Sequence, residues 1–253
     1  NSFRFWPLIA KLWYNRNLYW FYKRADLIIT PTNYSKKCID NYNLGTPVIA
    51  ISNGINPSEY AYNQSYIDDF KNKFNLKDDE KVVIGVGFPF NRKGIKDFIE
   101  IGRKFPDIKF FWFGHLAKIL TEHNVLKAIK NRPANVIMPG YIDGHIIKGA
   151  YHFAKVFMFT SYEETEGIVV LEALASKCPV MIRNIGVYED WMEDGKTCLK
   201  AENNEGFAAN LVKILNSDCS EMVNEGYKIS EQRTIEEVGK DLKEAYESVL
   251  LKK

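Results

Sequence analysis

The sequence lacks the patterns that mark a metal-binding or disulfide-rich protein. Its 253 residues include four cysteines and four histidines, but no CxxC pair and no HEXXH motif is among them. Isolated cysteines are typical of small core residues in a reduced, cytoplasmic protein. We therefore expect no metal site and a cytoplasmic location.

Long apolar runs, low-complexity tracts and internal repeats are also missing. No stretch of about twenty apolar residues, the length that spans a bilayer, occurs in the chain. The content of 46% hydrophobic and 26% charged residues is ordinary for a globular protein. A net charge of +2 does not indicate a class of partner, and we expect no nucleic acid among the partners.

Short apolar runs that alternate with helical patterns fill the chain from about residue 81. The predicted strands are residues 81–87, 108–114, 135–140, 155–161, 179–184 and 197–201. Continuous apolar strands separated by helices indicate a parallel sheet that is covered on both faces. Because crossover connections are right-handed, we predict an α/β fold with a doubly wound, Rossmann-like parallel sheet. Helical patterns also fill residues 119–129, 205–215, 220–231 and 234–253.

Two further apolar runs, residues 25–32 and 46–54, predict parallel strands joined by a helix over residues 34–42. Two strands cannot close a core of their own. They therefore either extend the main sheet or belong to a second domain whose start is absent. The segment "SNGINPSEY" carries Asn-Gly and Pro turn signals, which predict a hinge near residues 53–57.

A glutamate lies inside an apolar helical pattern at residues 163–175, "EETEGIVVLEALA". This helix should begin near Gly167 and be buried, and it would bury Glu172 with it. Burial of an unpaired carboxylate costs several kcal/mol, so Glu172 needs partners. Two hydroxyls, as on a ribose, would serve, and so would a Lys or Arg from a neighbouring element. The pattern alone leaves both possibilities open.

Charged and polar groups follow two of the predicted strands, where open parallel sheets bind ligands. The free backbone N–H groups of Gly167, Ile168 and Val169 favour an anion such as a phosphate, and Glu164 precedes this terminus. After the first strand, the pair 92–93 is placed to bind a diphosphate, with Arg92 able to contact it bidentately. The alternative for Arg92 and Lys93 is a solvated surface pair.

Other loop features are less specific. The segment "GVGFPFNRKG" has neither the GxGxxG spacing nor the GK[ST] ending of the common phosphate loops. Tyr141 could lie near a flat base or could cap the sheet edge. His115 is more typical of a core or surface histidine than of a catalytic one. The first 22 residues carry nine aromatic side chains among basic residues, which suits either a membrane interface or a helix buried in its own domain.

Taken in order, these segments resemble one family. "SYEETEGIVVLEALASKCPV" resembles the E-x7-E signature of retaining family 4 glycosyltransferases of the GT-B fold. "VIAISNGINPSEY" is similar to their interdomain segment, and "NRKGIKDF" to their phosphate-binding turn. The resemblance implies that Glu172 binds the ribose hydroxyls of a nucleotide and that Glu164 contacts the donor sugar. The amides at the start of the helix would hold the diphosphate, and Lys93 would neutralise it without a metal.

Two departures from the family pattern point to one branch of it. The family often has E-G-F-G where this chain reads Glu164-Thr165-Glu166-Gly167, and it often has an Arg where this chain has Phe88. Arg92 would then supply the missing charge. Both departures resemble the branch that glucosylates diacylglycerol, which implies UDP-glucose as the donor, no cofactor, a lipid acceptor and a peripheral position on the inner face of a membrane.

The resemblance also implies a domain organisation. Residues 1–56 would be the remnant of an N-terminal acceptor domain with the hinge, and residues 57–233 the nucleotide-sugar domain. Residues 234–253 would form a helix that returns toward the first domain. Transfer of another sugar, to another lipid or to a polysaccharide, is the alternative activity. A chain with so little of the acceptor domain could also act only as a non-catalytic nucleotide-sugar binding module.

Overall fold

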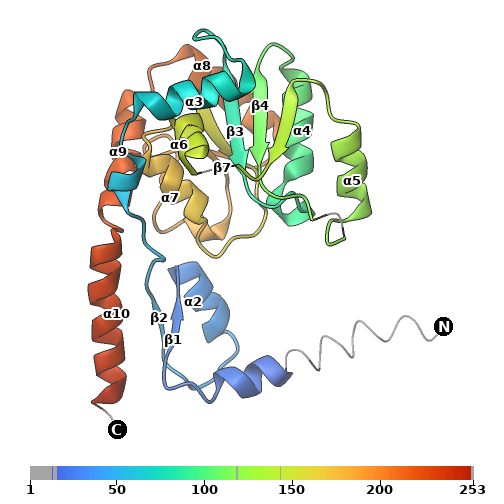
Figure 1. The fold of residues 1–253 in the computed structure, drawn as a ribbon. Coiled ribbons are helices and arrows are strands. Elements are labelled where there is room, and N and C mark those ends of the chain that lie inside the picture. Colours follow the sequence, from blue (N-terminus) through green and yellow to red (C-terminus); the bar gives the residue numbers. More distant parts are fainter. Residues whose placement is uncertain (1–12, 14–15, 118, 143, 252–253) are drawn as a thin grey trace, which may run out of the picture.

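The computed structural model describes residues 13, 16–117, 119–142 and 144–251 and confirms the α/β fold. Six parallel strands form one sheet in the order β5-β4-β3-β6-β7-β8, and β3 and β4 lie side by side in Figure 1. Its strands are β3 Val82–Val86, β4 Lys109–Phe113, β5 Val136–Gly140, β6 Val156–Phe159, β7 Val180–Arg183 and β8 Leu199–Ala201. Each one lies within a segment for which the sequence predicted a strand.

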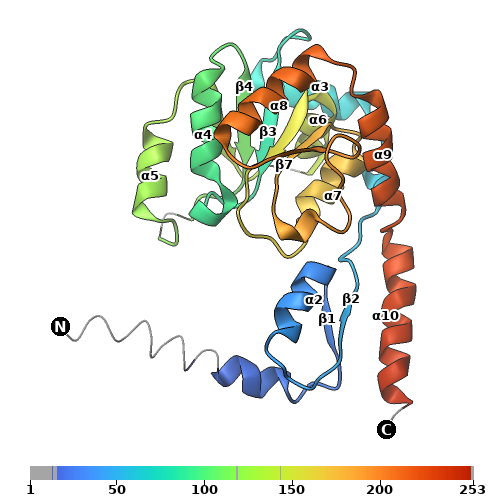
Figure 2. The same ribbon diagram turned by 180° about the vertical axis from the view of Figure 1, so that it is seen from behind.

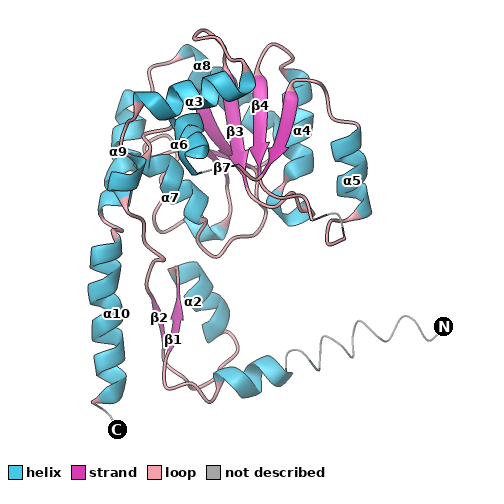
Figure 3. Cartoon of the chain, viewed as in Figure 1, coloured by secondary structure: helices cyan, strands magenta, loops and turns pink. Residues whose placement is uncertain are grey.

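Helices cover both faces of this sheet, as a doubly wound fold requires (Figure 3). The helices and helical turns are η2 Pro57–Tyr60, α3 Gln64–Phe74, η3 Asn91–Lys93, α4 Ile95–Lys104, α5 His123–Lys130, α6 Gly144–Phe153, α7 Ile168–Ala175, η4 Gly186–Tyr188, α8 Asn204–Asn216, α9 Ser220–Glu231 and α10 Ile235–Leu250. Helices α3, α6 and α7 share one hydrophobic core with the sheet, and α4, α5 and α8 share another.

The strands are mainly apolar because most of their residues are buried on one face of the sheet or the other. In β3, Val82 and Ile84 pack into the core on one face, while Val83 packs into the core on the other. The same alternation separates Phe111 from Phe110 in β4. Successive side chains of a strand point to opposite faces, so a sheet with two cores favours consecutive apolar residues in its strands.

Helix α3 was not predicted from the sequence. Of its eleven residues only Ile67 and Phe70 are buried, so its apolar stripe is too narrow to dominate a polar segment. The predicted helix over residues 119–129 was placed too early, since α5 spans His123–Lys130.

The two upstream strands do not extend the main sheet, which resolves the alternative that the sequence left open. Strands β1 Ile28–Thr30 and β2 Val48–Ala50 form a separate parallel pair, with α2 Asn33–Asp40 between them. We call residues 25–51 the β1–β2 unit. Helix α10 lies alongside this unit in both views (Figures 1 and 2), and its Val238 and Ala245 pack against Ile51.

The aromatic segment at the start of the chain is partly outside the described residues, because residues 1–12 and 14–15 are not among them. Residues 16–22 are helical. Trp13, Trp20 and Phe21 are 64%, 58% and 66% exposed, and the guanidinium of Arg24 lies 3.4 Å from the ring centroid of Trp20. Within the described part of the chain, no helix combines the length and the apolar character needed to cross a bilayer.

Contact between α3 and α6 depends on a glycine. A β-carbon added to Gly149 would lie 1.9 Å from the backbone oxygen of Tyr66, so Gly149→Ala should force the two helices apart. We expect it to lower the free energy of unfolding by about 1–3 kcal/mol, the usual range for overpacking. Gly144→Ala in the same helix is the control, because nothing lies within 4 Å of the added atom. Equal stability of the two variants in denaturant titrations would contradict this packing.

Candidate functional site

The strand order changes direction between β3 and β6. From β3 the chain moves through β4 to β5, and from β6 it moves through β7 to β8, toward the opposite edge of the sheet. The connections after β3 and β6 therefore diverge and leave a crevice at the carboxyl ends of these strands. In open parallel sheets this is where ligands bind.

Hydrogen bonds to backbone carbonyl oxygens connect the loops that follow β3 and β6. The Thr160 hydroxyl donates to the carbonyl oxygen of Gly94 at 2.9 Å. The Ser161 hydroxyl and the Tyr162 N–H donate to the carbonyl oxygen of Arg92 at 3.1 Å and 2.7 Å. Gly94 has φ +72°, and a β-carbon there would lie 2.1 Å from the Thr160 oxygen, so only glycine allows this approach.

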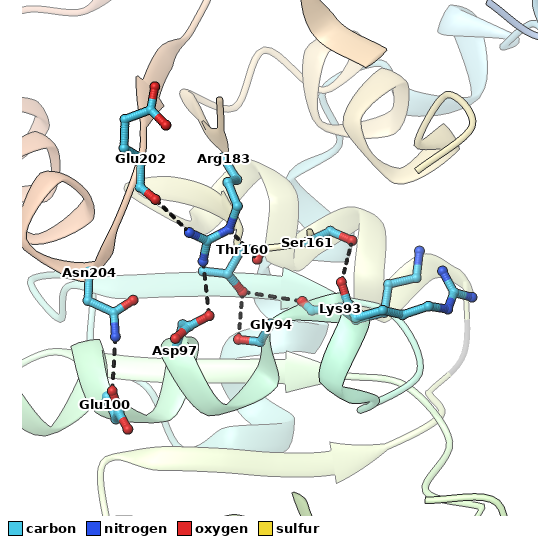
Figure 4. A network of polar contacts seen from close by, with 10 residues as sticks. Lys93, Gly94, Asp97, Glu100, Thr160, Ser161, Arg183, Glu202 and Asn204 are labelled. Carbon is cyan, nitrogen blue, oxygen red and sulfur yellow. Dashed lines mark hydrogen bonds and ion pairs between the residues drawn. The ribbon is translucent and has the colours of Figure 1, made fainter. Parts of the chain in front are cut away.

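A buried arginine also contacts the loop after β6. It was not identified from the sequence as a site residue. Arg183, the last residue of β7, is 5% exposed. Its guanidinium donates to the carbonyl oxygens of Thr160 at 3.0 Å and Glu202 at 2.9 Å, and it forms an ion pair with Asp97 at 2.9 Å (Figure 4). Arg183 therefore connects the end of β7 to the loop after β6 and to α4.

Two of the predicted site residues meet across the crevice. Lys93, on the loop after β3, forms an ion pair with Glu164, on the loop after β6. Their side chains are only 15% and 8% exposed, so salt and solvent screen this pair less than a typical surface salt bridge. The Lys93 ammonium also lies 5.5 Å from the ring centroid of Phe159. The lysine and the glutamate thus act as one unit in this structure.

Helix α7 begins where the sequence predicted, directly after Gly167. Gly167 is the N-cap residue with φ +87°, and no side chain among the described residues caps it. A β-carbon at Gly167 would lie 2.8 Å from the hydroxyl of Tyr188. Val169, in the first turn, lines the cavity described next, so the helix terminus, whose first backbone N–H groups lack partners within the helix, borders the crevice.

A cavity of about 330 Å³ opens beside this terminus. Its lining residues are Val86, Gly87, Phe88, Phe113, Gly114, His115, Tyr141, Ile142, Gly144, Ile147, Val169 and Glu172. Most of these side chains are apolar, and Glu172 contributes the one carboxylate among them. An apolar cavity with a few polar groups is typical of a site for a small molecule or a nucleotide.

Glu172 is held by tyrosines. The Tyr151 hydroxyl, on α6, donates to its carboxylate at 2.9 Å, and within the described part of the chain no Lys or Arg forms an ion pair with it. Burial raises the pKa of Glu172, while hydrogen bonds from Tyr151 and Tyr60 and the charge of Lys148 oppose that rise. The salt bridge that the sequence left open as an explanation for Glu172 is absent here.

The remaining candidates lie at different distances from the cavity. Tyr141 is 81% exposed at its rim, and His115 lines it at the end of β4. Arg92 is exposed and lines a separate hollow with Asp97 and Glu163. The described residues contain no group of three or more side chains that could hold a metal ion. The binding roles of all these residues stay predictions.

The charge on Glu172 should destabilise the protein when no ligand is bound. A raised pKa means that the folded protein retains the proton to a higher pH than the unfolded chain. Stability therefore falls as the pH rises through that window, and the cost is fully present above it. We expect Glu172→Gln to raise the free energy of unfolding at pH 7 by roughly 0.5–2 kcal/mol, and the gain should shrink as the pH falls.

Glu164→Gln is the matched control for this measurement. It removes the partner of a largely buried lysine, so it should lower stability in the same denaturant titrations. A loss of stability in Glu172→Gln at pH 7 would show that the carboxylate has a stabilising partner.

The comparisons with known proteins agree with this geometry. Residues 66–232 match the model of the family "Glycosyl transferases group 1". The chain is 51% identical to the "Processive diacylglycerol alpha-glucosyltransferase" of Acholeplasma laidlawii over 98% of its length and 75% of that protein. It is 26% identical to the "Alpha-galactosylglucosyldiacylglycerol synthase" of Streptococcus pneumoniae over 74% of its length, and covers 51% of that relative.

Solved structures show the same fold at low sequence identity. The sucrose-phosphate synthase of Thermosynechococcus elongatus superposes with a TM-score of 0.83 at 19% identity, over 94% of this chain and 62% of that one. The Anabaena protein HepE, solved with UDP-glucose, has a TM-score of 0.82 at 17% identity, over 92% of this chain and 67% of that one. The chain described here belongs to the group 1 family of glycosyltransferases, and its parallel sheet is consistent with the Rossmann-like C-terminal domain of the GT-B fold.

Proposed function

We propose that this chain provides the donor site of a retaining glycosyltransferase that transfers glucose from UDP-glucose to a diacylglycerol-type lipid. The product would be an α-glucosyl glycolipid. The observation that carries the proposal is the carboxylate of Glu172, which lines an apolar cavity and forms no ion pair with a Lys or Arg among the described residues. The name of the relative at 51% identity supports the choice of glucose and diacylglycerol.

In this proposal the nucleotide half of the donor occupies the cavity. The two ribose hydroxyls would donate to Glu172, in an environment where a buried carboxylate needs donors. The exposed ring of Tyr141 at the rim would lie near the base. Val169, in the first turn of α7, lines the same cavity, so its backbone N–H, with those of Gly167 and Ile168, would bind the diphosphate.

The reaction places negative charge on the diphosphate, because the bond between the sugar and the phosphate oxygen breaks with its electrons on the oxygen. Lys93 and the N-terminus of α7 would stabilise that charge as fixed donors. Lys93 now pairs with Glu164, and the arriving phosphates would share its ammonium group. Glu164 would then have oxygen acceptors free for hydroxyls of the donor sugar.

The exposed aromatic segment suits an acceptor in a membrane. Trp13, Trp20 and Phe21 are solvent-exposed and are interspersed with Arg16 and Arg24. Tryptophan with basic residues favours the interface of an anionic bilayer. We therefore propose a peripheral position on the inner face of the membrane, where the chain would meet a lipid acceptor.

Sugar transfer tests the proposal directly, in the protein that carries this chain and with vesicles that contain diacylglycerol. We expect labelled glucose to pass from UDP-glucose to the lipid. Glu164→Gln and Glu172→Gln should each lower kcat/KM for UDP-glucose by about 10- to 100-fold, because each removes a charged hydrogen bond to the bound donor. Glu163→Gln is the matched control, because this neighbouring glutamate is exposed and has no proposed role.

The alternative functions predict different outcomes of the same assay. Transfer from UDP-galactose but not from UDP-glucose would show a different donor. Transfer only to a polysaccharide would show a different acceptor class. Binding of UDP without any transfer would identify a nucleotide-sugar binding module, and unchanged kcat/KM in both glutamate variants would contradict the site.

Chelation tests the proposed absence of a metal. Because Lys93 and the helix terminus carry the charge stabilisation in this mechanism, EDTA should leave the transfer rate unchanged, while Lys93→Met should lower it by about 100-fold. Loss of activity in EDTA that Mg²⁺ restores would contradict a metal-free reaction.

A further inference from the structure

The loop between β6 and α7, residues 160–167, carries a buried glutamate that contacts a distant part of the chain. Glu166 is 1% exposed. One of its carboxylate oxygens accepts from the Asn53 backbone N–H at 2.9 Å and from the Asn53 side-chain amide at 2.7 Å. Its other oxygen accepts from the Ser52 hydroxyl. Charge-assisted hydrogen bonds to a buried carboxylate are strong and costly to break.

Ser52 and Asn53 lie where the chain crosses from the β1–β2 unit to the main domain. The returning crossing lies beside them, because Ile55 donates its N–H to the Arg233 oxygen at 2.9 Å and accepts from the Ile235 N–H at 3.0 Å. Glu166 thus binds the chain at the place where its two parts are joined.

The neighbouring residue makes the same connection through its backbone. The carbonyl oxygen of Thr165 accepts from the Thr32 hydroxyl at 2.8 Å and from the Ser35 hydroxyl at 3.1 Å. Thr32 is the N-cap of α2, so both donors belong to the β1–β2 unit. Residues 165 and 166 are therefore bound to that unit from two sides, and they lie directly between Glu164 and Gly167.

We propose that Glu166 is a positioning residue through which the Ser52–Asn53 crossing sets the placement of Glu164. This inference rests on the proposed function, since Glu164 would contact the donor sugar. Seating of the β1–β2 unit on the loop would then complete the sugar half of the donor site.

The nucleotide half should be independent of this contact. Glu172 is held by Tyr151 on α6, and Tyr141 follows β5; neither residue lies on the 160–167 loop. Loss of the Glu166 contact should therefore weaken the binding of UDP-glucose more than that of UDP. A purely structural role would lower the stability and affect both ligands alike.

Calorimetric titration tests the role of Glu166. UDP and UDP-glucose are each titrated into the wild-type protein, Asn53→Ala, Glu166→Gln and the double variant. Asn53→Ala should weaken UDP-glucose by about tenfold, a typical coupling between sites, and leave UDP unchanged. The double variant should be no weaker than Glu166→Gln alone, because the two residues share one contact. Asn56→Ala is the matched control, since its side chain binds Ser58 instead.

Hydrogen exchange of the 160–167 loop, measured without ligand, distinguishes a failure of the role proposed for Glu166 from a failure of the proposed function. Asn53→Ala should speed exchange in this loop while exchange in β3 and β4 stays as in the wild type. Unchanged exchange, or equal weakening of UDP and UDP-glucose, would overturn the role of Glu166. If the wild-type protein bound neither ligand, the proposed function would fall, and the exchange result would still decide whether the crossing holds the loop.

Discussion

The close approach of the loops after β3 and β6 is the constraint on which the rest of the site depends. It requires glycine at position 94, because any β-carbon there would overlap the Thr160 oxygen. The buried guanidinium of Arg183 holds the same oxygen from the other side. With both loops fixed, Lys93 and Glu164 meet across the crevice, and the N-terminus of α7 faces the same space.

Three acids near this crevice have different environments, and the differences suggest different roles. Glu164 is neutralised by Lys93, and the buried Glu166 receives three donors from the Ser52–Asn53 crossing. Glu172 is the least satisfied, with tyrosine donors, a raised pKa and a face toward the cavity. In the proposed function, the ribose hydroxyls of the ligand would donate further hydrogen bonds to Glu172. The buried carboxylate would then lower the stability of the free protein in exchange for ligand binding.

Much of the fold could be predicted from the sequence, because buried parallel strands leave continuous apolar runs. Each of the six strands lay in a predicted segment, and α7 began at the predicted glycine. Helix α3 was not predicted, since only two of its side chains are buried. The seating of the β1–β2 unit also could not be predicted, because it depends on contacts between distant segments.

The residues of the candidate site could be predicted only where they stood out from their neighbours in the sequence. Glu172 stood out because a carboxylate in an apolar helix is a local conflict. Glu166 did not, because its burial depends on Asn53, which is 113 positions away, and three glutamates share that loop. Arg183 ends an apolar strand, and a charge in that place could have been recognised as a buried ion pair or a ligand contact. Its partners Thr160 and Asp97 are visible only in three dimensions.

A crystal structure of the protein with UDP bound would test the central claim most directly. The account predicts ribose hydroxyls within hydrogen-bond distance of the Glu172 carboxylate and the diphosphate between Lys93 and the N-terminus of α7. UDP bound elsewhere, or ribose hydroxyls turned away while Glu172 keeps only its tyrosine donors, would contradict it.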